Sequence, residues 1–362
     1  MIRLTIKESK SEVEAYFKSL KTDGVGYETS GGTIVWYKME KPLTFIAESD
    51  GTFKFTRNAL QYSLDSGDTW STLAADTDSP TVTAGNSIMW KQTGLTPTVG
   101  GGIGTFSSTG KFKALGNVMS LLYGDDFSGE TNLIVKTSAF YGLFSVCTGL
   151  TKAYNLSLPA KILNDWCYYN MFRDCTSLTT APVLPATTLA EGCYQSMFVN
   201  CTSLTTAPEL PATTLADDCY LRMFLGCTSL TSAPELQVTT LADGCYSEMF
   251  ENCRHLTTAP ELPATTLADG CYSGMFSGCT SLTTAPTLPA TILKKLCYVN
   301  MFAGCTSLNY IKCLATNISA TNCTNYWVRS VSSTGTFAKN ASMTSWGSGD
   351  SGIPNNWTVQ DA

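Results

Sequence analysis

Apolar residues in the second half of the chain return to the same positions every 26 residues. Repeats of about 20 to 50 residues are typical of solenoids and propellers, in which each unit buries its apolar face against its neighbours. We therefore expect a solenoid of about seven repeats over residues 139–322. Two cysteine series mark the period: Cys167, Cys193, Cys219, Cys245, Cys271, Cys297 and Cys323, and Cys175, Cys201, Cys227, Cys253, Cys279 and Cys305.

Within one repeat, the pattern predicts a strand, a turn and then a helix. Thr188 indicates the start of the helix, because Glu191 follows three residues later as in a capping box. Leu189, Cys193 and Met197 then stand at i, i+4 and i+8, which places them on one helical face. We expect this face to point into the core.

The residue before the second cysteine of each repeat predicts where the helix ends. Only aspartate, asparagine and glycine occupy this position, and these residues enter the left-handed region of backbone space most readily. A helix C-cap requires that conformation, so we expect a positive φ at this position in every repeat. The six residues are Asp174, Asn200, Gly226, Asn252, Gly278 and Gly304.

The extended part of each repeat has a different spacing. Leu204, Ala207 and Leu210 lie three residues apart, and Pro208 and Pro211 stand between and after them. Proline is rare in central strands because it cannot donate a ladder hydrogen bond, and threefold spacing with proline is typical of polyproline II. The sequence therefore predicts a short strand at Leu-Thr-Thr that runs into an extended, poorly paired arm.

The repeat resembles a known family. Its pattern Met-Phe-x-x-Cys-Thr-Ser-Leu, followed by an arm ending in Leu-Pro, is similar to the leucine-rich repeats of BspA-like proteins from Bacteroidota and their phages and mobile elements. The usual unit is about three residues shorter, with Ala-Phe in place of Met171-Phe172 and a branched aliphatic in place of Ala181-Pro182. The ending SGIPNNWTVQDA resembles leucine-rich proteins of Bacteroides prophages and virions. The resemblance implies an α/β leucine-rich-repeat fold and little about the ligand.

Three further regions flank the repeats. Residues 1–40 are predicted to form a small α+β module with strands at Arg3–Lys7, Val25–Glu28 and Thr33–Tyr37 and a helix at Ser11–Leu20. Residues 41–138 alternate apolar and polar positions with frequent turn residues, which predicts a β-sandwich. Residues 323–362 leave the period and are expected to form an irregular C-terminal cap.

One motif in the predicted sandwich resembles the Asp-box of sialidases. Ser63, Asp65, Gly67, Thr69 and Trp70 match its pattern once. In sialidases the box is a structural hairpin away from the catalytic centre. We therefore expect Asp65 to bond its own turn, with Trp70 packed beneath it, and no sialidase activity.

Composition excludes several functions. The chain has 362 residues, 14% of them charged, and a net charge of −6, so it offers no basic track for nucleic acid. It contains no apolar run long enough to insert into a membrane, and its first residues lack the apolar core of a secretory signal.

The chemistry-bearing residues favour a structural role. Fifteen cysteines alone suggest a disulfide scaffold, but repeated slots stack in columns, so we expect free, buried thiols. His255 is the single histidine, and the same slot holds serine in most other repeats. Since no catalytic group is assembled, we expect a protein that is not an enzyme.

A solenoid without catalytic residues is typical of recognition or adhesion proteins. The first hypothesis is a virion or contractile-particle component, of the tail-fibre or receptor-binding type, that contacts a bacterial surface. Residues 1–40 would then bind other proteins of the particle. The alternative is a BspA-like adhesin on a bacterial cell surface that binds host matrix or other cells. Both hypotheses predict a cell-surface glycan or protein as the partner.

Positions that vary between repeats while sharing one face are the candidates for partner binding. On the arms these are Glu209, Glu235 and Glu261, flanked by Val183 and Thr287. Their carboxylates, roughly 5 Å apart by strand spacing, repel one another unless they are solvated or bridged by a cation such as Ca²⁺. The column is thus either a solvated acidic stripe or a partner-binding surface. On the predicted helices the candidates are Gln195, Arg222 and Glu248.

Overall fold

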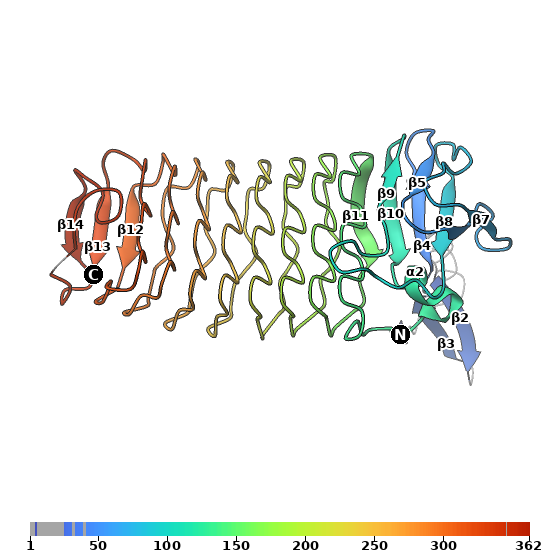
Figure 1. Cartoon of the computed structure of the whole chain (residues 1–362), viewed down its shortest axis with the longest axis horizontal. Coiled ribbons are helices and arrows are strands. Elements are labelled where there is room, and N and C mark those ends of the chain that lie inside the picture. The colour runs from blue at the N-terminus through green and yellow to red at the C-terminus, as the bar shows by residue number, and fades with distance from the viewer. Residues whose placement is uncertain (1–3, 6–24, 31–32, 39–40, 345) are drawn as a thin grey trace.

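The computed structural model describes residues 4–5, 25–30, 33–38, 41–344 and 346–362 (Figure 1). In the N-terminal part, β1 (Leu4–Thr5), β2 (Val25–Ser30) and β3 (Thr33–Lys38) form an antiparallel sheet in the order β1-β3-β2. The strands predicted near Val25 and Thr33 are confirmed. The helix predicted at Ser11–Leu20 lies outside the described residues.

Residues 41–138 form two sheets around an aromatic core. A six-stranded sheet has the order β11-β10-β4-β8-β6-β7, in which β11 (Leu150–Ser157) follows residues 41–138 in the chain, and β5 pairs with β9 in a second, smaller sheet. The Phe45 ring lies 4.7 to 5.2 Å from the rings of Phe53, Phe106 and Phe112, so both sheets contribute to one core. The strands are β4 (Leu43–Ala47), β5 (Phe53–Phe55), β6 (Leu60–Ser63), β7 (Ser71–Leu73), β8 (Ser87–Lys91), β9 (Phe106–Ser108) and β10 (Phe112–Asn117).

The six-stranded sheet extends directly into the repeat region. Strand β11 (Leu150–Ser157) lies in the first repeat and pairs in parallel with β10. The Phe144 ring stacks between those of Phe106 and Phe172, with centroids 5.8 and 5.5 Å apart. The two regions therefore share one continuous core.

The helices predicted in the repeats are wrong. The only helical segments among the described residues are α2 (Ser120–Tyr123) and η2 (Gly124–Phe127), both before the repeats. Each repeat instead forms a series of tight turns and an extended arm, and Figure 1 shows these units side by side along the long axis of the molecule. We call one 26-residue unit a rung. The described chain is thus mostly strands, bridges and turns.

Successive N–H groups in the turns alternate between two kinds of hydrogen bond. The N–H of Gln195 donates to the carbonyl of Gly192 and closes a turn at 3.1 Å. The next N–H, of Ser196, donates to the carbonyl of Leu221 on the following rung at 2.8 Å. This alternation leaves few N–H groups for the i→i−4 bonds of a helix, and it joins each rung to its neighbour.

A four-residue turn explains why the sequence pattern imitated a helix. Leu189, Cys193 and Met197 are buried as predicted, but successive turns repeat every 4.0 residues instead of 3.6. Residues spaced by four therefore keep one orientation, whereas on a helix they would drift around the axis. Thr188 does not cap a helix, because it forms a β-bridge with Thr214 on the next rung.

Every fourth residue in the turns has a positive φ. In one rung these residues are Gly192, Ser196 and Asn200, with φ between 54° and 58°. The left-handed conformation predicted before the second cysteine is confirmed, with φ between 57° and 75° at Asp174, Asn200, Gly226, Asn252, Gly278 and Gly304. These residues end the last of three turns instead of a helix.

The arms are poorly paired, as predicted, but the short strand predicted at Leu-Thr-Thr is wrong for most rungs. Between residues 158 and 309 this segment forms isolated parallel bridges instead, such as Thr206 to Ser232 and Ser232 to Thr258.

The thiols follow the sequence prediction. All fifteen cysteines are free and buried. The second cysteine of a rung donates to a phenylalanine carbonyl of the preceding rung, for example Cys201 Sγ to Phe172 O at 3.1 Å. Each thiol in this column thus gives a backbone carbonyl group one additional hydrogen bond. A valine or alanine in the same position could not donate this bond.

The hydrogen-bonded turns continue past residue 322. Tyr298 N donates to Cys323 O at 2.9 Å, and Phe302 N donates to Trp327 O at 2.8 Å. Strands β12 (Tyr310–Cys313), β13 (Thr336–Lys339) and β14 (Thr358–Asp361) then form a parallel sheet at the C-terminal end. No helix in the described part of the chain has the length and apolar character needed to cross a membrane.

Candidate partner-binding surface

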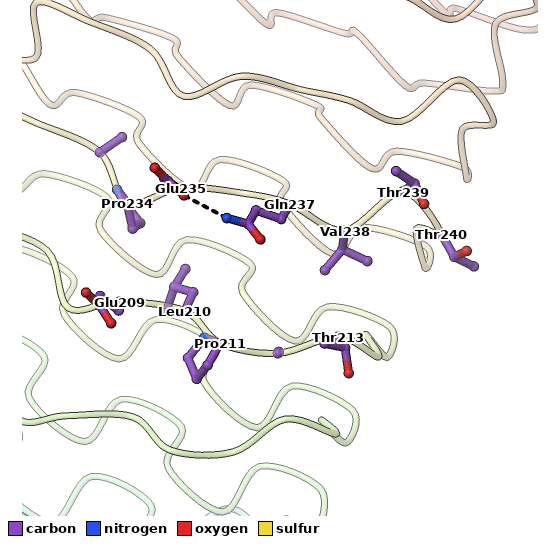
Figure 2. Close-up of a pocket in the computed structure, with 12 residues that line it drawn as sticks. Glu209, Leu210, Pro211, Thr213, Pro234, Glu235, Gln237, Val238, Thr239 and Thr240 are labelled. Carbon is purple, nitrogen blue, oxygen red and sulfur yellow. Dashed lines mark hydrogen bonds between the residues drawn. The ribbon is translucent and has the colours of Figure 1, made fainter.

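The glutamates predicted to bind a partner stand in one slot of three consecutive arms. Glu209, Glu235 and Glu261 are all exposed, and each lies between a proline and a leucine of its arm. We call the surface formed by residues 207–213, 233–239 and 259–265 the arm face. Glu235 accepts a hydrogen bond from the amide of Gln237 at 2.7 Å, as Figure 2 shows.

A cleft of about 730 Å³ opens on the arm face between two of these arms (Figure 2). Glu209 and Glu235 flank one end of the cleft, and Thr213 and Thr239 flank the other. Leucine, proline, alanine and valine side chains line the middle, together with the polar side chain of Gln237. The cleft therefore combines an acidic end, a largely apolar middle and a hydroxyl-bearing end.

An interruption of the repeat explains the position of the cleft. Gln237 and Val238 occupy the slots that hold Pro-Ala in the neighbouring arms. The alanine of this slot is almost fully buried, as at Ala264 with 1% exposure, whereas Val238 is half-buried. A valine side chain is too large for a slot that fits one methyl group, so the arm is displaced from its neighbour.

The displaced arm uncovers side chains that other rungs bury. Leu184 and Leu262 are 1% and 2% exposed, whereas Leu210, in the same slot beside the cleft, is half-buried. The arms are bridged on both sides of the gap, at Thr188 to Thr214 and at Thr240 to Thr266. The opening is thus local, and a single dipeptide accounts for it.

A second hollow of about 420 Å³ lies on the other side of the same arm. Pro234, Glu235 and Gln237 border both hollows, and Pro260 and Glu261 of the next arm also line the second. The three predicted glutamates therefore border two adjoining hollows.

The glutamate column does not fit a calcium ion. Calcium requires six to eight oxygen ligands, which proteins supply from several converging groups. No group of three or more histidine, cysteine, aspartate or glutamate side chains in the described residues is placed to hold a metal ion. One of the carboxylates, that of Glu235, is already bonded to an amide.

The candidates predicted on helices lie on turns. Arg222 and Glu248 occupy equivalent positions of adjacent rungs, with φ of 58° and 53°. The guanidinium binds the carboxylate through two bonds, Nε to Oε2 at 2.7 Å and a terminal nitrogen to Oε1 at 3.2 Å. Both border a hollow of about 330 Å³ with Arg173 and Asn200, and Gln195 is not among its lining residues.

One carboxyl group on these turns has an unusual proton affinity. Partial burial, reinforced by the neighbouring Glu248 carboxylate, raises the pKa of Glu251 to about 7. Glu251 therefore binds a proton more readily than an exposed glutamate does. The sequence contains no signal of this, because it depends on the contact of two glutamates across one turn.

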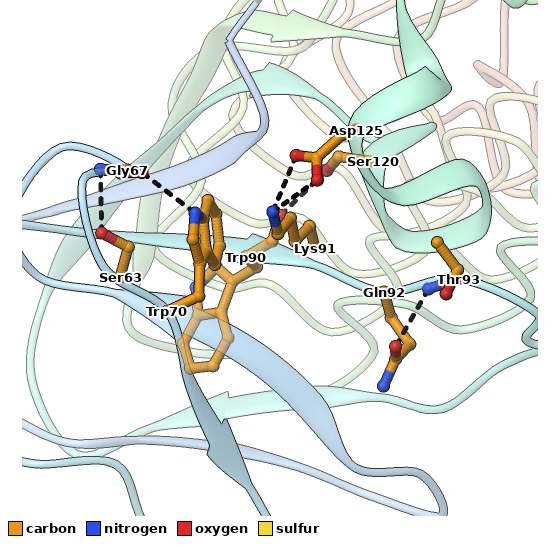
Figure 3. Close-up of polar contacts among 9 residues, drawn as sticks. All are labelled: Ser63, Gly67, Trp70, Trp90, Lys91, Gln92, Thr93, Ser120 and Asp125. Atoms are coloured by element: carbon orange, nitrogen blue, oxygen red, sulfur yellow. Dashed lines mark hydrogen bonds and ion pairs between the residues drawn. The ribbon is translucent and has the colours of Figure 1, made fainter.

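The Asp-box forms a self-contained hairpin, as predicted. Thr69 donates to Asp65 through its hydroxyl and its backbone N–H, and these bonds lower the pKa of Asp65 to about 2. The Trp70 indole donates to the carbonyl of Gly67 at 3.0 Å (Figure 3). Lys91 Nζ lies 4.1 Å from the Trp70 ring centre and binds Asp125 at 2.7 Å. These contacts hold the hairpin together and pack it against Lys91.

His255 takes over the contact of the serine that it replaces. Its Nδ1 bonds the carbonyl of Thr228 on the preceding rung. In another rung, Ser203 Oγ donates to the carbonyl of Thr176 at 2.6 Å. The histidine thus serves as a link between rungs at an exposed position.

Comparison of the chain with protein-family models, curated proteins and solved structures gave no match. The class of the protein is therefore described from its fold and its surface. It is a mostly β-stranded protein with hydrogen-bonded rungs, an interior of thiols and stacked aromatic rings, and hollows on its arm face.

Proposed function

We propose that the chain is a non-enzymatic recognition protein whose repeats form a leucine-rich-repeat solenoid. We further propose that it is a virion or contractile-particle component of the receptor-binding type, which contacts a bacterial surface. The cleft between residues 209–213 and 233–240 is the observation that carries the proposal. It is a built recess, with an apolar lining and polar ends, on an otherwise regular surface.

The rigidity of the rungs supports a recognition role. Every second N–H of the turns bonds the next rung, and the stacked rings inside hold a regular spacing, such as 5.3 Å between Phe172 and Phe198. A surface fixed in this way loses little conformational entropy when a partner binds.

The state of the candidate nucleophiles supports a non-enzymatic role. Burial raises the pKa of the Cys147, Cys227 and Cys305 thiols to about 12. A thiol with such a pKa carries almost no thiolate at neutral pH and reacts slowly. His255, the single histidine, is exposed and bonds a backbone carbonyl.

A cell-binding experiment tests the proposal. Fluorescently labelled full-length protein is incubated with a panel of Bacteroidota cells, and bound fluorescence is measured by flow cytometry. We expect saturable binding to some strains, and a loss of at least about tenfold in affinity in the triple variant Glu209→Gln, Glu235→Gln, Glu261→Gln. The control variant Glu130→Gln, Glu191→Gln removes two carboxylates that lie outside the cleft.

The outcomes separate the hypotheses. Binding to matrix-coated surfaces and to no bacterial strain would favour the surface adhesin over the particle component. Equal binding by the triple variant and the wild type would place the partner site away from the arm face. For the particle assignment itself, mass spectrometry of purified virions must find the chain among the structural proteins.

A further inference from the structure

We infer that the cleft on the arm face binds an extended peptide segment in which lysine or arginine alternates with aliphatic residues. This inference rests on the proposed recognition function and names the chemistry of the partner. The shape, the lining and the charge of the cleft each contribute one step.

The shape of the cleft fits an extended chain. It lies between two extended arms and runs from Glu209 and Glu235 to Thr213 and Thr239 (Figure 2). Five residues of an extended chain, with four steps between them, span about 13 Å, which matches the five residues of each bordering arm. A peptide lying along the cleft would follow the direction of the arms.

The lining of the cleft accepts aliphatic side chains. Leu210 and Val238 are half-buried, although the leucine slot of the other arms is closed. Part of each side chain therefore remains open to water beside the cleft. Covering them with an aliphatic side chain is favourable by about 25 cal/mol per Å² of apolar surface removed from water.

The charges around the cleft select a cationic partner. Glu209, Glu235 and Glu261 border the two hollows, and within the described residues no lysine, arginine or histidine lines either one. No aromatic residue lines them, so they offer a sugar no ring face. Carboxylates without a nearby cation favour lysine or arginine on the partner.

The alternation follows from the geometry of an extended chain. Successive side chains of a strand point in opposite directions. A peptide in the cleft would therefore turn every second side chain toward Leu210 and Val238. Of the side chains between them, the one nearest the end formed by Glu209 and Glu235 would reach these carboxylates.

Fluorescence anisotropy with a defined probe tests the inference. The probe is a fluorescein-labelled peptide of seven residues that alternates lysine and valine, titrated with the full chain. We expect saturable binding that weakens with added salt, because exposed charge pairs are screened. Probes with glutamate in place of lysine, or serine in place of valine, should bind at least about tenfold more weakly.

Two variants of the protein give independent readouts. The double variant Gln237→Pro, Val238→Ala restores the Pro-Ala of the neighbouring arms and should close the cleft, with a loss of affinity of at least about tenfold. The variant Glu209→Gln, Glu235→Gln keeps the cleft and should weaken binding while removing most of its salt dependence. Since both glutamates are exposed, this variant should fold normally, and Glu130→Gln, Glu191→Gln is its matched control.

Three outcomes would overturn the inference: unchanged affinity in the closed-cleft variant, equal binding of the glutamate probe, or binding of neutral glucan oligosaccharides instead of the peptide. The assay contains no cells, so its failure is distinguishable from failure of the proposed function. Cell binding that depends on the three glutamates, without peptide binding, would retain the recognition site and reject the peptide as its partner.

Discussion

Residues with a positive φ set the path of the backbone in every rung. Gly270 and Gly278 have φ of 62° and 73°, and a side chain at Gly270 would meet no atom within 4 Å. A non-glycine residue in this region costs about 1–2 kcal/mol. We expect Gly270→Ala to lower the free energy of unfolding by that amount, measured by urea denaturation. Gly278→Ala should lower it by more, because the added methyl group would also meet the side chain of Asn252.

Asparagine provides the control for this prediction. Asn200 and Asn252 already occupy the slot of Gly278, with φ of 57° and 60°. Gly278→Asn should therefore be closer to wild type than Gly278→Ala. Equal losses for the two variants would mean that the backbone conformation is not the source of the effect.

The contacts of the exposed histidine, His255, predict that it is not needed for stability or for binding. His255→Ser should leave the melting temperature and cell binding unchanged, because serine makes the same bond to the preceding rung elsewhere in the chain. Differential scanning fluorimetry and the cell-binding assay measure both. A loss of binding in His255→Ser would give this residue a recognition role.

At the scale of the elements, the sequence predicted which residues are buried at equivalent positions of the rungs. It did not predict that these residues lie on four-residue turns instead of helices. A spacing of four residues, as in Leu189, Cys193 and Met197, fits one face of a helix and also a row of four-residue turns. The difference lies in residues prone to positive φ at every fourth position, such as Gly192, Ser196 and Asn200. Trp166, Arg222 and Leu296 also have a positive φ at equivalent positions, although their residue types rarely adopt it. The four-residue recurrence of positive φ is therefore hard to recognise in the sequence.

The candidate site was predictable in part. Variable residues on the arms mark the column of Glu209, Glu235 and Glu261 in the sequence itself. The cleft beside them depends on how far a valine displaces an arm from its neighbour, which is a property of packing in three dimensions. Gln237 and Val238 are visible as a departure from the repeat, but only the structure shows the opening that they cause.

Columns of buried thiols make the fold sensitive to alkaline pH. Burial raises the pKa of thiols such as Cys193 well above their ordinary value of 9.0. The folded chain keeps these protons, while the unfolded chain loses them as the pH passes about 9. The stabilising contribution is complete below that pH and decreases above it, by about 1.4 kcal/mol per pH unit for each buried thiol.

Thermal unfolding in the presence of a phosphine reductant measures this effect. We expect a nearly constant melting temperature from pH 7 to 8.5 and a steep fall from pH 9 to 10.5. The reductant itself should have no effect at pH 7, because all fifteen cysteines are free. A constant melting temperature up to pH 10.5 would show that the thiols are accessible and able to ionise in the folded chain.

For the whole molecule, the equivalence of the rungs predicts that one can be removed. Deletion of residues 271–296 joins Gly270 to Cys297, which occupies the same slot as Cys271. The shortened chain should fold, with a maximum dimension in small-angle scattering that is smaller by about 5 Å, one spacing between strands.

Deletion of half a rung is the matched control. Removal of residues 271–283 would place arm residues where turn residues belong and expose the columns of thiols and rings. This variant should be unfolded by circular dichroism. A folded half-rung variant, or an unfolded full-rung variant, would contradict the equivalence of the units.

The bonds between rungs also determine how the protein responds to a pull. The N–H groups that join neighbouring rungs, such as Ser196 to Leu221, are directed along the long axis of the molecule. Tension between the two ends would therefore open one interface at a time, beginning at the weakest. Each detached rung frees 26 residues, about 90 Å of extended chain. Under the proposed function, a protein that tethers a particle to a moving cell would lengthen in steps as its rungs detach. This lengthening would reduce the peak force on the attachment when the load rises suddenly.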